Sequence, residues 1–561
     1  MIQKHPREMP VRIIPLGGVE EIGRNMTVIE YGNDIVVIDA GLEFPQEETP
    51  GIDYIIPNTK YLEARKHKIR GLIISHGHLD HVGAIPYLIE RLGLPPIYTT
   101  KLTKAMILKR QEEFPHSRRL HIEEIKSDSM IKLGQLKARF FDITHTIPDA
   151  IGTILETPFG NVIYPGDFKI ELDVKGKPMH IDQYTKLGKE KNLVLLMEST
   201  NAEAPGFSIP EKTVHQNLEK IIAGAKGRVI TGTFSSLLER IIEIIKIAER
   251  HGRKVVIDGF SMKANVEIAK ELGFFKPKKD TIITADRISS YPPEKIVAIC
   301  TGAQGEENAA LMRIANRKHK YIRIQKDDAI ILSSSIIPGN ERNIQNLKDN
   351  LARQGAKIIH YKVADVHASG HAYQEELKLM LKMLRPKFLI PIHGYYFMLK
   401  TNADLAESVG ISKENIAIPL NNGSIIEVTK EKIHLLKESV PANLVMVDGL
   451  GVGDVQEVVM RDRQALAQDG IFVVITIIDS QTGKVRNSPD IISRGFVYLR
   501  ESQELLRQVR HLIRKTVEDA TAKMHPINMD YVKNLLRENI GKFLFQKTKR
   551  RPMVLTVLIE V

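Results

Sequence analysis

Short apolar runs alternate with turns and amphipathic segments along the first third of the chain. Residues 12–16, 26–30 and 35–38 are apolar runs of strand length, and turn residues such as Gly17 and Gly18 separate them. Apolar runs bounded by turn residues are typical of buried strands. The pattern therefore predicts a layered α/β domain in this region.

The periodicity changes near residue 208. In residues 237–250, isoleucines recur at helical spacing and share one face, and a strand-like run at residues 254–258 follows. This alternation of helix and strand continues to about residue 357. Since histidine-rich stretches lie on both sides of this α/β block, we interpret it as an insertion into the first domain.

The last part of the chain predicts a small α+β domain. Residues 471–478, 496–499 and 554–560 are rich in apolar, β-branched residues and predict strands, and residues 503–523 predict a helix. The predicted domains are residues 1–207 with 366–440, an inserted domain at 208–365, a glycine-rich linker at 441–452 and a C-terminal domain at 453–561.

The amino-acid composition limits the kinds of metal site and the location that the protein can have. The chain has 561 residues, which exceeds what one core supports, and 43% of them are hydrophobic, as in soluble globular proteins. The single cysteine, Cys300, excludes thiolate-rich zinc sites, so a metal must be held by imidazole and carboxylate. No apolar run approaches the roughly 18 residues of a membrane span. We therefore expect a cytoplasmic protein without a membrane partner.

The formal net charge of +12 favours a polyanionic partner, because Lys and Arg displace counterions condensed on phosphates. The alternative is a basic enzyme without such a partner, and charge alone does not decide between them. The basic residues 547–551 similarly indicate either an RNA contact or a solvated charged face.

A cluster of metal-binding residue types follows the strand-like residues 71–75. It consists of His76, His78, Asp80 and His81 within one short stretch. A lone histidine is usually a core or surface residue, but three with an aspartate at this spacing indicate a metal site. His76 and His78 project to the same side, and Asp80 and His81 face a second metal at the start of the next helix.

Two metal ions would need more ligands than these four residues supply. His145, Asp167 and His393 each follow a short strand-like segment, where open α/β sheets build their sites. A carboxylate at Asp167 can bridge two cations about 3.5–4 Å apart, as phosphoryl chemistry requires. Asp39 also ends a strand-like run, and we expect it to orient a ligand imidazole or the region of Asp167.

These motifs resemble those of the metallo-β-lactamase superfamily. Glu198-Ser199-Thr200-Asn201, His367 to His371 and His393 are similar to motifs of its β-CASP nucleases. Longer strings resemble the bacterial ribonuclease J family along essentially the whole chain; they include Gly166-Asp167-Phe168-Lys169, Ser333-Ser334-Ser335 and Ser493-Arg494-Gly495-Phe496-Val497. The resemblance implies a metallo-β-lactamase αββα sandwich, an inserted β-CASP α/β domain and a small α+β C-terminal domain.

The resemblance also implies an activity. We expect a ribonuclease with 5′→3′ exonuclease and endonuclease action on single-stranded RNA that prefers 5′-monophosphate ends and serves mRNA decay and rRNA maturation. It would use two zinc ions per subunit, with Mn²⁺ or Mg²⁺ as other supporting ions. A homodimer or homotetramer and association with an RNA-degradation complex or the ribosome are expected.

Residue roles carry over by position. One zinc would be bound by His76, His78 and His145, the other by Asp80, His81 and His393, with Asp167 bridging. The expected catalytic residues are Asp80, which would accept the proton of water, Glu198, and His371 as general acid or as a hydrogen-bond donor to the phosphate. An alternative for His371 is that it caps the helix at residues 373–384. The expected phosphate pocket comprises Ser236, His367, Ala368, Ser369, Gly370 and His371.

The sequence departs from the family pattern at a few positions. Glu198 replaces a common aspartate, Leu237-Leu238-Glu239 replaces a polar pair, Ala303 replaces serine, and Tyr395 replaces glutamate. We expect these changes to bear on recognition of the 5′ end.

Other functions share part of this pattern. A DNA-directed β-CASP nuclease would have the same site, and a non-catalytic paralogue would bind RNA without hydrolysis. A small-molecule hydrolase of the glyoxalase type would share the first histidine motif but would not explain the inserted domain. Aromatic residues make up only 6% of the chain, so backbone contacts should outweigh base stacking and sequence preference should be weak.

Overall fold

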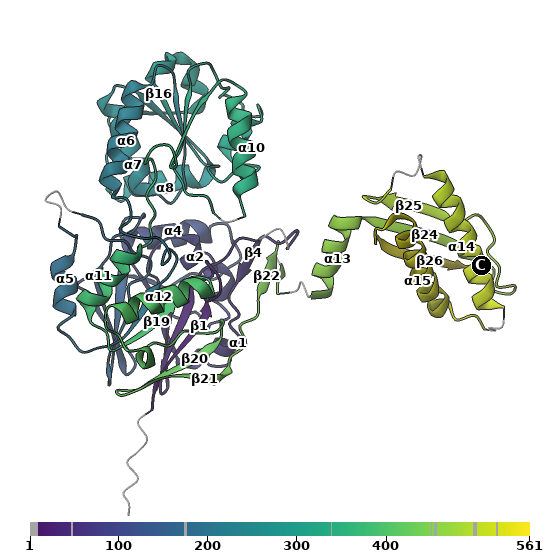
Figure 1. Ribbon diagram of the computed structural model, residues 1–561, viewed down its shortest axis with the longest axis horizontal. Coiled ribbons are helices and arrows are strands. Elements are labelled where there is room, and N and C mark those ends of the chain that lie inside the picture. The colour runs from purple at the N-terminus through teal and green to yellow at the C-terminus, as the bar shows by residue number, and fades with distance from the viewer. Residues whose placement is uncertain are drawn as a thin grey trace, which may run out of the picture. The chain divides into compact units, whose positions relative to one another are not determined.

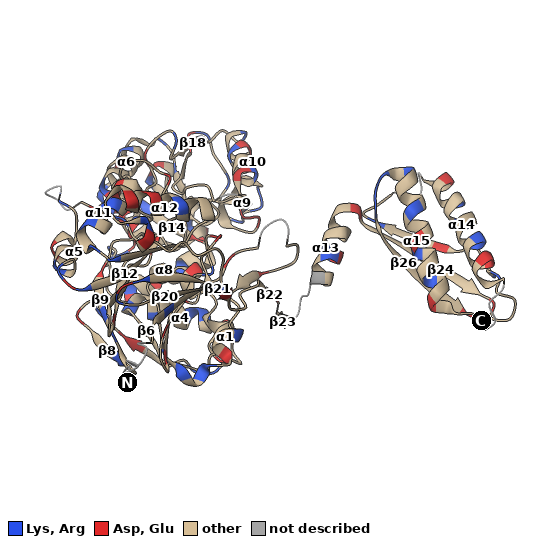
Figure 2. Cartoon of the chain, turned by 60° about the horizontal axis from the view of Figure 1, so that its bottom comes forward, with Lys and Arg blue, Asp and Glu red and all other residues tan. Residues whose placement is uncertain are grey.

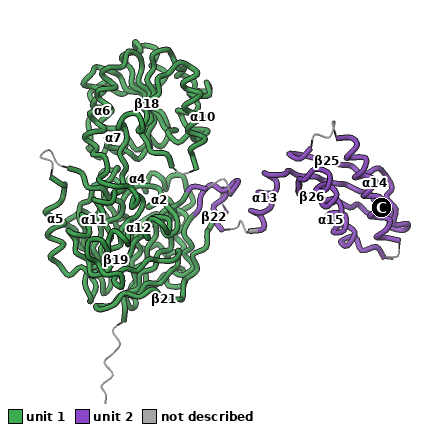
Figure 3. Tube along the Cα trace, viewed as in Figure 1, with its two compact units in different colours: residues 1–43, 56–445 green, residues 44–55, 446–561 purple. Residues whose placement is uncertain are grey.

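The computed structural model describes residues 9–45, 49–172, 177–337, 339–449, 451–453, 457–497, 502–522 and 526–561. The chain divides into two compact units (Figure 3). Unit 1 comprises Met1–Glu43 and Ile56–Val445, and unit 2 comprises Phe44–Ile55 and Met446–Val561. Among the described residues, no helix is long and apolar enough to cross a membrane.

Two sheets of unit 1 form a sandwich. The first has the strand order β21-β20-β1-β2-β3-β5-β6-β7 and the second the order β19-β12-β11-β10-β9-β8. Their bounds are β1 Val11–Gly17, β2 Met26–Tyr31, β3 Asp34–Ile38, β5 Ile69–Ile73, β6 Ile97–Thr99, β7 Ile122–Glu124, β8 Met130–Leu133, β9 Leu136–Asp142, β10 Ile151–Thr157, β11 Gly160–Tyr164, β12 Asn192–Glu198, β19 Phe388–Ile392, β20 Ser424–Val428 and β21 Ile433–Ser439. One core joins the inner faces; for example, Ile13 and Val36 cluster with Leu155 and Leu196.

Segments far apart in sequence complete both sheets. Strand β19 pairs in parallel with β12, and β20 pairs antiparallel with β1. Because β19 follows the α/β block and β12 precedes it, pairing of these strands brings the two histidine-rich parts of the chain together.

Helices cover the sandwich. They are α1 Lys60–Glu63, α2 Leu79–Val82, α3 Ile85–Leu88, α4 Lys101–Gln111, α5 Ile181–Leu187, α11 Gln374–Leu384 and α12 Tyr396–Ser408, with short 3-10 turns at Lys66–Lys68 and Lys413–Asn415. Leu377 and Leu381 of α11 pack with Tyr184 of α5 and with Leu195 of β12. The αββα sandwich expected from the sequence is confirmed.

A parallel sheet forms the β-CASP part of unit 1, with the order β15-β14-β16-β13-β17-β18. Its strands are β13 Val229–Gly232, β14 Lys254–Asp258, β15 Ile282–Ile283, β16 Ile296–Cys300, β17 Ala329–Leu332 and β18 Lys357–His360. Its helices are α6 Glu211–Gly224, α7 Leu238–Arg250, α8 Phe260–Glu271, α9 Ala310–Ala315 and α10 Glu341–Ala352, with 3-10 turns at Ala285–Ser290 and Pro293–Lys295.

Alternate residues of these strands pack on opposite faces. Val229 of β13 clusters with α6, α7 and α8, whereas the next residue, Ile230, clusters with α9 and α10. Figure 1 shows α6 and α7 on one side of the sheet and α10 on the other. Because helices cover both faces, the carboxyl ends of the strands are where this sheet can present functional loops.

Unit 2 holds two smaller sheets, β23-β22-β4 and β25-β24-β26. The elements of this part are β4 Tyr54–Ile56, β22 Val445–Asp448, β23 Gly451–Val452, α13 Glu457–Asp469, β24 Ile471–Ile478, β25 Asp490–Arg494, α14 Gln503–Thr521, α15 Met529–Thr548 and β26 Met553–Glu560. Phe472 of β24 packs with Val509 of α14 and Leu536 of α15. Figure 2 shows Lys and Arg residues along α14 and α15. The expected C-terminal α+β domain is confirmed.

One predicted strand, at residues 496–499, is wrong where the structure describes it. Phe496 and Val497 lie outside any strand, because β25 ends at Arg494 and Gly495 turns the chain with a φ of 70°. Phe496 is buried because its ring packs against that of Phe472, with ring centroids 5.9 Å apart. Residues 498–499 lie outside the described residues. The predicted linker at 441–452 contains β22 and β23.

Candidate metal centre

The predicted donor residues follow strands of the sandwich. His76 and His78 lie after β5, and α2 carries Asp80 and His81. His145 follows β9, Asp167 follows β11 and His393 follows β19. Pairing of these strands places residues from four parts of the chain at one end of the two sheets. All of the donor residues named from the sequence meet there.

His76, His78 and His145 form the first donor group. His78 Nδ1 lies 3.0 Å from His76 Nε2 and 3.1 Å from His145 Nε2. The outer nitrogen of His145, Nδ1, donates to the carbonyl oxygen of Gly370 at 2.7 Å, so its Nε2 presents a lone pair to the group.

Burial keeps this group neutral. It lowers the pKa of His76 and His145 well below the usual range and that of His78 to about 4, and neighbouring imidazoles lower the first two further. Neutral imidazoles present lone pairs to a common point, and a cation satisfies such an arrangement. The donor set therefore fits a divalent metal.

Asp80, His81, Asp167 and His393 form the second group. His81 Nε2 lies 3.1 Å from Asp167 Oδ2 and 3.4 Å from Asp80 Oδ2. His393 contributes Nδ1, at 2.7 Å from Asp167 Oδ1. Asp167 Oδ2 also lies 3.8 Å from His76 Nε2 of the first group, so this carboxylate stands between the two groups.

The charges of the second group stabilise one another. Burial opposes ionisation of His81, but the carboxylates of Asp167, Asp80 and Asp39 outweigh it and hold its pKa well above the usual range. Burial likewise opposes the charge of Asp167, and the imidazoles of His393 and His81 hold its pKa well below its usual range. A site with this excess of carboxylate charge suits a hard or borderline cation.

Asp39 lies beneath the donor groups, fully buried. Its Oδ2 accepts from His81 Nδ1 at 2.8 Å, from Ser75 Oγ at 2.9 Å and from the hydroxyl of Tyr164 at 2.7 Å. This pattern fixes the His81 ring with Nε2 toward the centre, which is how carboxylates orient metal-binding imidazoles.

The backbone at the centre has left-handed residues and close contacts that few residue types tolerate. Asp39 and His393 have left-handed φ angles of 62° and 55°, which non-glycine residues adopt at a cost. A Cβ on Gly41 would collide with the carbonyl oxygen of Asp80, and one on Gly370 would lie 2.6 Å from His145 Cε1. Close backbone approach therefore requires glycine at these two positions.

His371 and Glu198 form a pair beside the second group, and Asp167 and His393 complete a cluster with them. His371 Nδ1 donates to Glu198 Oε2 at 2.6 Å. Burial opposes its charge, but Glu198 and Asp167 raise the pKa of His371 to about 9. The helix-cap alternative for His371 is wrong, because Tyr373 is the N-cap residue of α11 and forms a capping box with Glu376.

The loop from His367 to His371 reaches the centre through its last residues. Asn201 Nδ2 donates to Ser369 Oγ at 2.7 Å and to the carbonyl oxygen of His371 at 3.3 Å. At the start of the loop, His367 and Ala368 are buried and face the β-CASP part of the unit. Ser236 lies half-buried in the turn between β13 and α7.

Sequence reasoning missed Asn25. Its Nδ2 lies 3.2 Å from His81 Nε2 and 3.2 Å from His393 Nε2, and it also donates to the carbonyl oxygen of Asp80. Nothing in the chain near Asn25 marks it as a metal-site residue, since it belongs to the loop between β1 and β2. Pairing of these strands carries it to the centre.

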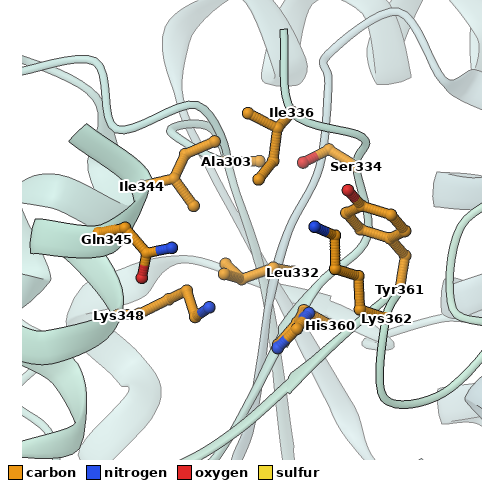
Figure 4. A pocket seen from close by; sticks show the side chains of 10 residues that line it. All are labelled: Ala303, Leu332, Ser334, Ile336, Ile344, Gln345, Lys348, His360, Tyr361 and Lys362. Carbon is orange, nitrogen blue, oxygen red and sulfur yellow. The ribbon is translucent and has the colours of Figure 1, made fainter. Parts of the chain in front are cut away.

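The residues that depart from the family pattern lie in different places. Glu239 is in the first turn of α7, and Tyr395 is the N-cap residue of α12, with its ring stacked on Phe397 at 6.1 Å. Ala303 lines a cavity of about 70 Å³ at the carboxyl ends of β17 and β18, together with Lys348 and Lys362 (Figure 4). No donor residue lines this cavity, so it is separate from the candidate centre.

The fold and the donor groups define a metal-dependent hydrolase of the metallo-β-lactamase superfamily. Residues 19–177 match the description "Metallo-beta-lactamase superfamily", and residues 357–419 match "Zn-dependent metallo-hydrolase RNA specificity domain". Residues 226–351 match "Ribonuclease J, beta-CASP domain", and residues 458–561 match "Ribonuclease J C-terminal domain".

Bacterial ribonucleases J match this sequence over 98% of its length. Ribonuclease J2 of Bacillus subtilis (strain 168) is 37% identical over 552 residues, which cover 98% of this chain and 99% of that protein. Ribonuclease J 1 of Streptococcus pyogenes serotype M3 is 37% identical over 98% of this chain and 97% of its own length. The chain therefore belongs to the ribonuclease J family, as the sequence motifs indicated, and is a metal-dependent nuclease.

A solved structure shares the fold at low sequence identity. The crystal structure of a protein of unknown function from Enterococcus faecalis V583 matches with a TM-score of 0.54 and 16% identity. The match covers 76% of this chain and all of that one, and it bears on the fold alone.

Proposed function

We propose that this protein is a ribonuclease with 5′→3′ exonuclease and endonuclease activity on single-stranded RNA and a preference for 5′-monophosphate ends. The observation that carries the proposal is the complete set of donors in two adjoining groups, with the His371–Glu198 pair beside them. A catalytically retired paralogue would have no need to keep such a set.

The donors suit two zinc ions. His76, His78 and His145 would hold one, Asp80, His81 and His393 the other, and Asp167, which stands between the groups, would contact both. When bound, a pair of zinc ions acidifies water and polarises a phosphoryl oxygen, and Mn²⁺ or Mg²⁺ would support the same chemistry. Asp39 orients the imidazole of His81, and the side-chain amide of Asn25 lies beside His81 and His393.

Side chains of the protein are placed to accept and donate the protons of the reaction. Asp80 Oδ2 faces the second group and is placed to accept a proton from the attacking water. His371 is placed to donate a proton to the leaving 3′-oxygen or a hydrogen bond to the phosphate, because Glu198 occupies its Nδ1 and orients its Nε2 away from that carboxylate. Glu198 is buried and also accepts from the backbone nitrogen of Phe168 at 3.0 Å, which fixes it in place.

The loop from Ser369 to His371, with Ser236, would receive the 5′ phosphate. Ser369 and His371 are half-buried, and Gly370 between them contacts His145, so a phosphate bound at this loop would set the first phosphodiester near the donor groups. Few aromatic residues are available for stacking, and we expect backbone contacts and weak sequence preference. Base-specific cleavage of scrambled oligonucleotides would contradict this.

Family membership supports the wider role. We propose a cytoplasmic enzyme of mRNA decay and rRNA maturation that works as a homodimer or homotetramer and associates with an RNA-degradation complex or the ribosome. Sedimentation and pull-down from cell extract would test assembly separately from activity.

Time-resolved digestion tests the activity. Single-stranded RNA with a 5′-monophosphate should yield mononucleotides from the 5′ end, and matched 5′-triphosphate RNA should be degraded more slowly. His78→Ala should abolish both reactions. Full activity in that variant would reject the proposed centre.

A further inference from the structure

A group of buried charges lies between the sandwich and the β-CASP part of unit 1. Arg240 and Lys169 are each only 1% exposed, and Glu211 is 9% exposed. Lys169 Nζ pairs with Glu171 and lies 3.5 Å from Glu211 Oε1, and Arg240 pairs with the same Glu211. Buried ion pairs contribute little net stability compared with apolar packing, so the role of these charges is not explained by stability alone.

Arg240 joins these charges to the loop from His367 to His371. Its Nη1 donates to His367 Nδ1 at 2.6 Å, and its Nη2 donates to the carbonyl oxygen of Ala368 at 3.3 Å. Its Nη1 also lies 3.4 Å from Ser333 Oγ, and that hydroxyl donates to the carbonyl oxygen of Val366 at 2.6 Å. The residues at the start of the loop are thus fixed from α7 and from the end of β17.

The His367 ring is engaged in this contact. Burial and the neighbouring Arg240 lower the pKa of His367 to about 3, so the ring is neutral and Nδ1 accepts the hydrogen bond from the guanidinium. His367 is also 8% exposed, which leaves little of its ring to contact RNA.

The other end of the same loop forms part of the candidate centre. Gly370 accepts from His145 Nδ1, and His371 pairs with Glu198. Only Ser369 separates the Arg240 contact at Ala368 from Gly370, so a displacement at one end of the loop reaches the other.

We propose that Arg240 is a positioning residue, which fixes the start of the loop from His367 to His371 and thereby places His371 and the phosphate-receiving backbone beside the metal centre. This inference rests on the proposed function. The planar guanidinium suits the task because its fixed fork contacts Glu211, His367 and Ala368 at once, which the single ammonium of lysine cannot do.

Arg240→Lys tests the proposal, because it keeps the positive charge beside Glu211 and removes the fork. The matched control is Arg228→Lys. Arg228 is a buried arginine that directly precedes β13 and pairs through Nε and Nη2 with Asp328, at the end of β13 opposite to the one that leads into α7.

Two substrates separate positioning from damage to the metal centre. Hydrolysis of 5′-monophosphate RNA needs the loop, whereas hydrolysis of bis(p-nitrophenyl) phosphate needs only the metal centre, because its leaving group requires no proton. In Arg240→Lys we expect kcat on RNA to fall about 100-fold and kcat on the small ester to stay within about 3-fold. Bound metal, measured by elemental analysis, should stay unchanged. Arg228→Lys should lower the melting temperature without a selective loss on RNA.

A double-variant cycle gives an independent readout. If Arg240 acts through His371, Arg240→Lys should cost little more in an enzyme that already carries His371→Ala. His367→Asn, whose amide oxygen can accept from Arg240, should retain more RNA activity than His367→Leu, which keeps the test open if Arg240→Lys folds poorly.

The inference is overturned if Arg240→Lys behaves like Arg228→Lys, if both substrates are lost equally, or if the effects of Arg240→Lys and His371→Ala multiply. Failure of the proposed function would look different. In that case the wild-type protein itself would hydrolyse the small ester but not RNA.

Discussion

The two histidine-rich stretches of this protein reach the same centre in different ways. The stretch from His76 to His81 follows one strand, and its donors are placed by the turn into α2 and by buried Asp39 next to them. The loop from His367 to His371 is held by residues from other parts of the chain, namely Arg240, Asn201 and Glu198. The first stretch is suited to hold metal, and the second to present a substrate and a proton. A residue can therefore be essential for either task without being essential for the other.

The largest effect is expected where the first stretch is broken. Asp80→Ala removes a donor of the second group and the proposed acceptor of the water proton, so activity on RNA and on bis(p-nitrophenyl) phosphate should both fall at least about 10³-fold. Elemental analysis should show less bound metal. Loss of RNA hydrolysis alone, with the small ester still cleaved, would mean that the two stretches are not divided in this way.

A selective effect is expected where the second stretch is broken. His371→Ala removes the proton donor, and kcat on RNA should fall about 10²- to 10⁴-fold while hydrolysis of the small ester continues. His360→Ala is the control, since His360 ends β18 in the same unit outside the donor clusters. Equal loss on both substrates would place His371 in the metal site instead.

A substitution of Asp39 tests whether the first stretch depends on this carboxylate to bind metal. Asp39→Asn weakens the orientation of His81 and should lower the affinity for the metal by about 10- to 100-fold, as measured by titration against a chelating dye. Asp34→Asn is the matched control, because Asp34 begins β3, whereas Asp39 follows its end. Equal affinities in the two variants would argue against an orienting role for Asp39.

The smallest effect is expected at Glu239, three residues after Ser236. Partial removal from water raises the pKa of Glu239 to about 7; Glu211 and Glu171 raise it further, and Lys169 and Arg240 oppose them. The carboxyl is neutral below pH 7 and ionised above it, where it repels phosphates. The ratio of wild-type KM for RNA to that of Glu239→Gln should therefore rise by about 3- to 10-fold from pH 6 to pH 8. Glu243→Gln should give a ratio that does not change with pH, and a flat ratio for Glu239→Gln would contradict the prediction.

The metal-binding residues could be predicted from the sequence because their residue types and their positions along the chain both indicate a metal site. His76 to His81 form one short motif, and His145, Asp167 and His393 each follow a recognisable strand. Asn25 and Arg240 could not be found in this way, because the contacts that link them to the centre and its loop join residues far apart in the chain, 56 positions for His81 and 127 for His367. His367 was expected to contact phosphate, but its neighbours in sequence do not reveal that a distant guanidinium occupies its ring.

Secondary structure could likewise be predicted where local sequence determines it, and not where distant packing does. Short apolar runs predicted the buried strands of the sandwich, since burial determines both the composition and the pairing of these segments. At Phe496, apolar character comes from packing on Phe472 without strand pairing, and composition alone does not distinguish the two causes. Where tertiary packing determines the residue type, the sequence pattern predicts burial but not the element.

Ribonuclease activity is tested most directly by comparing hydrolysis of matched RNA and DNA strands of identical sequence, each with a 5′-monophosphate, in the presence of zinc or manganese. We expect metal-dependent release of mononucleotides from the 5′ end of the RNA, with much slower hydrolysis of the DNA. Preferred cleavage of DNA, or binding of RNA without any hydrolysis by the metal-loaded protein, would contradict it.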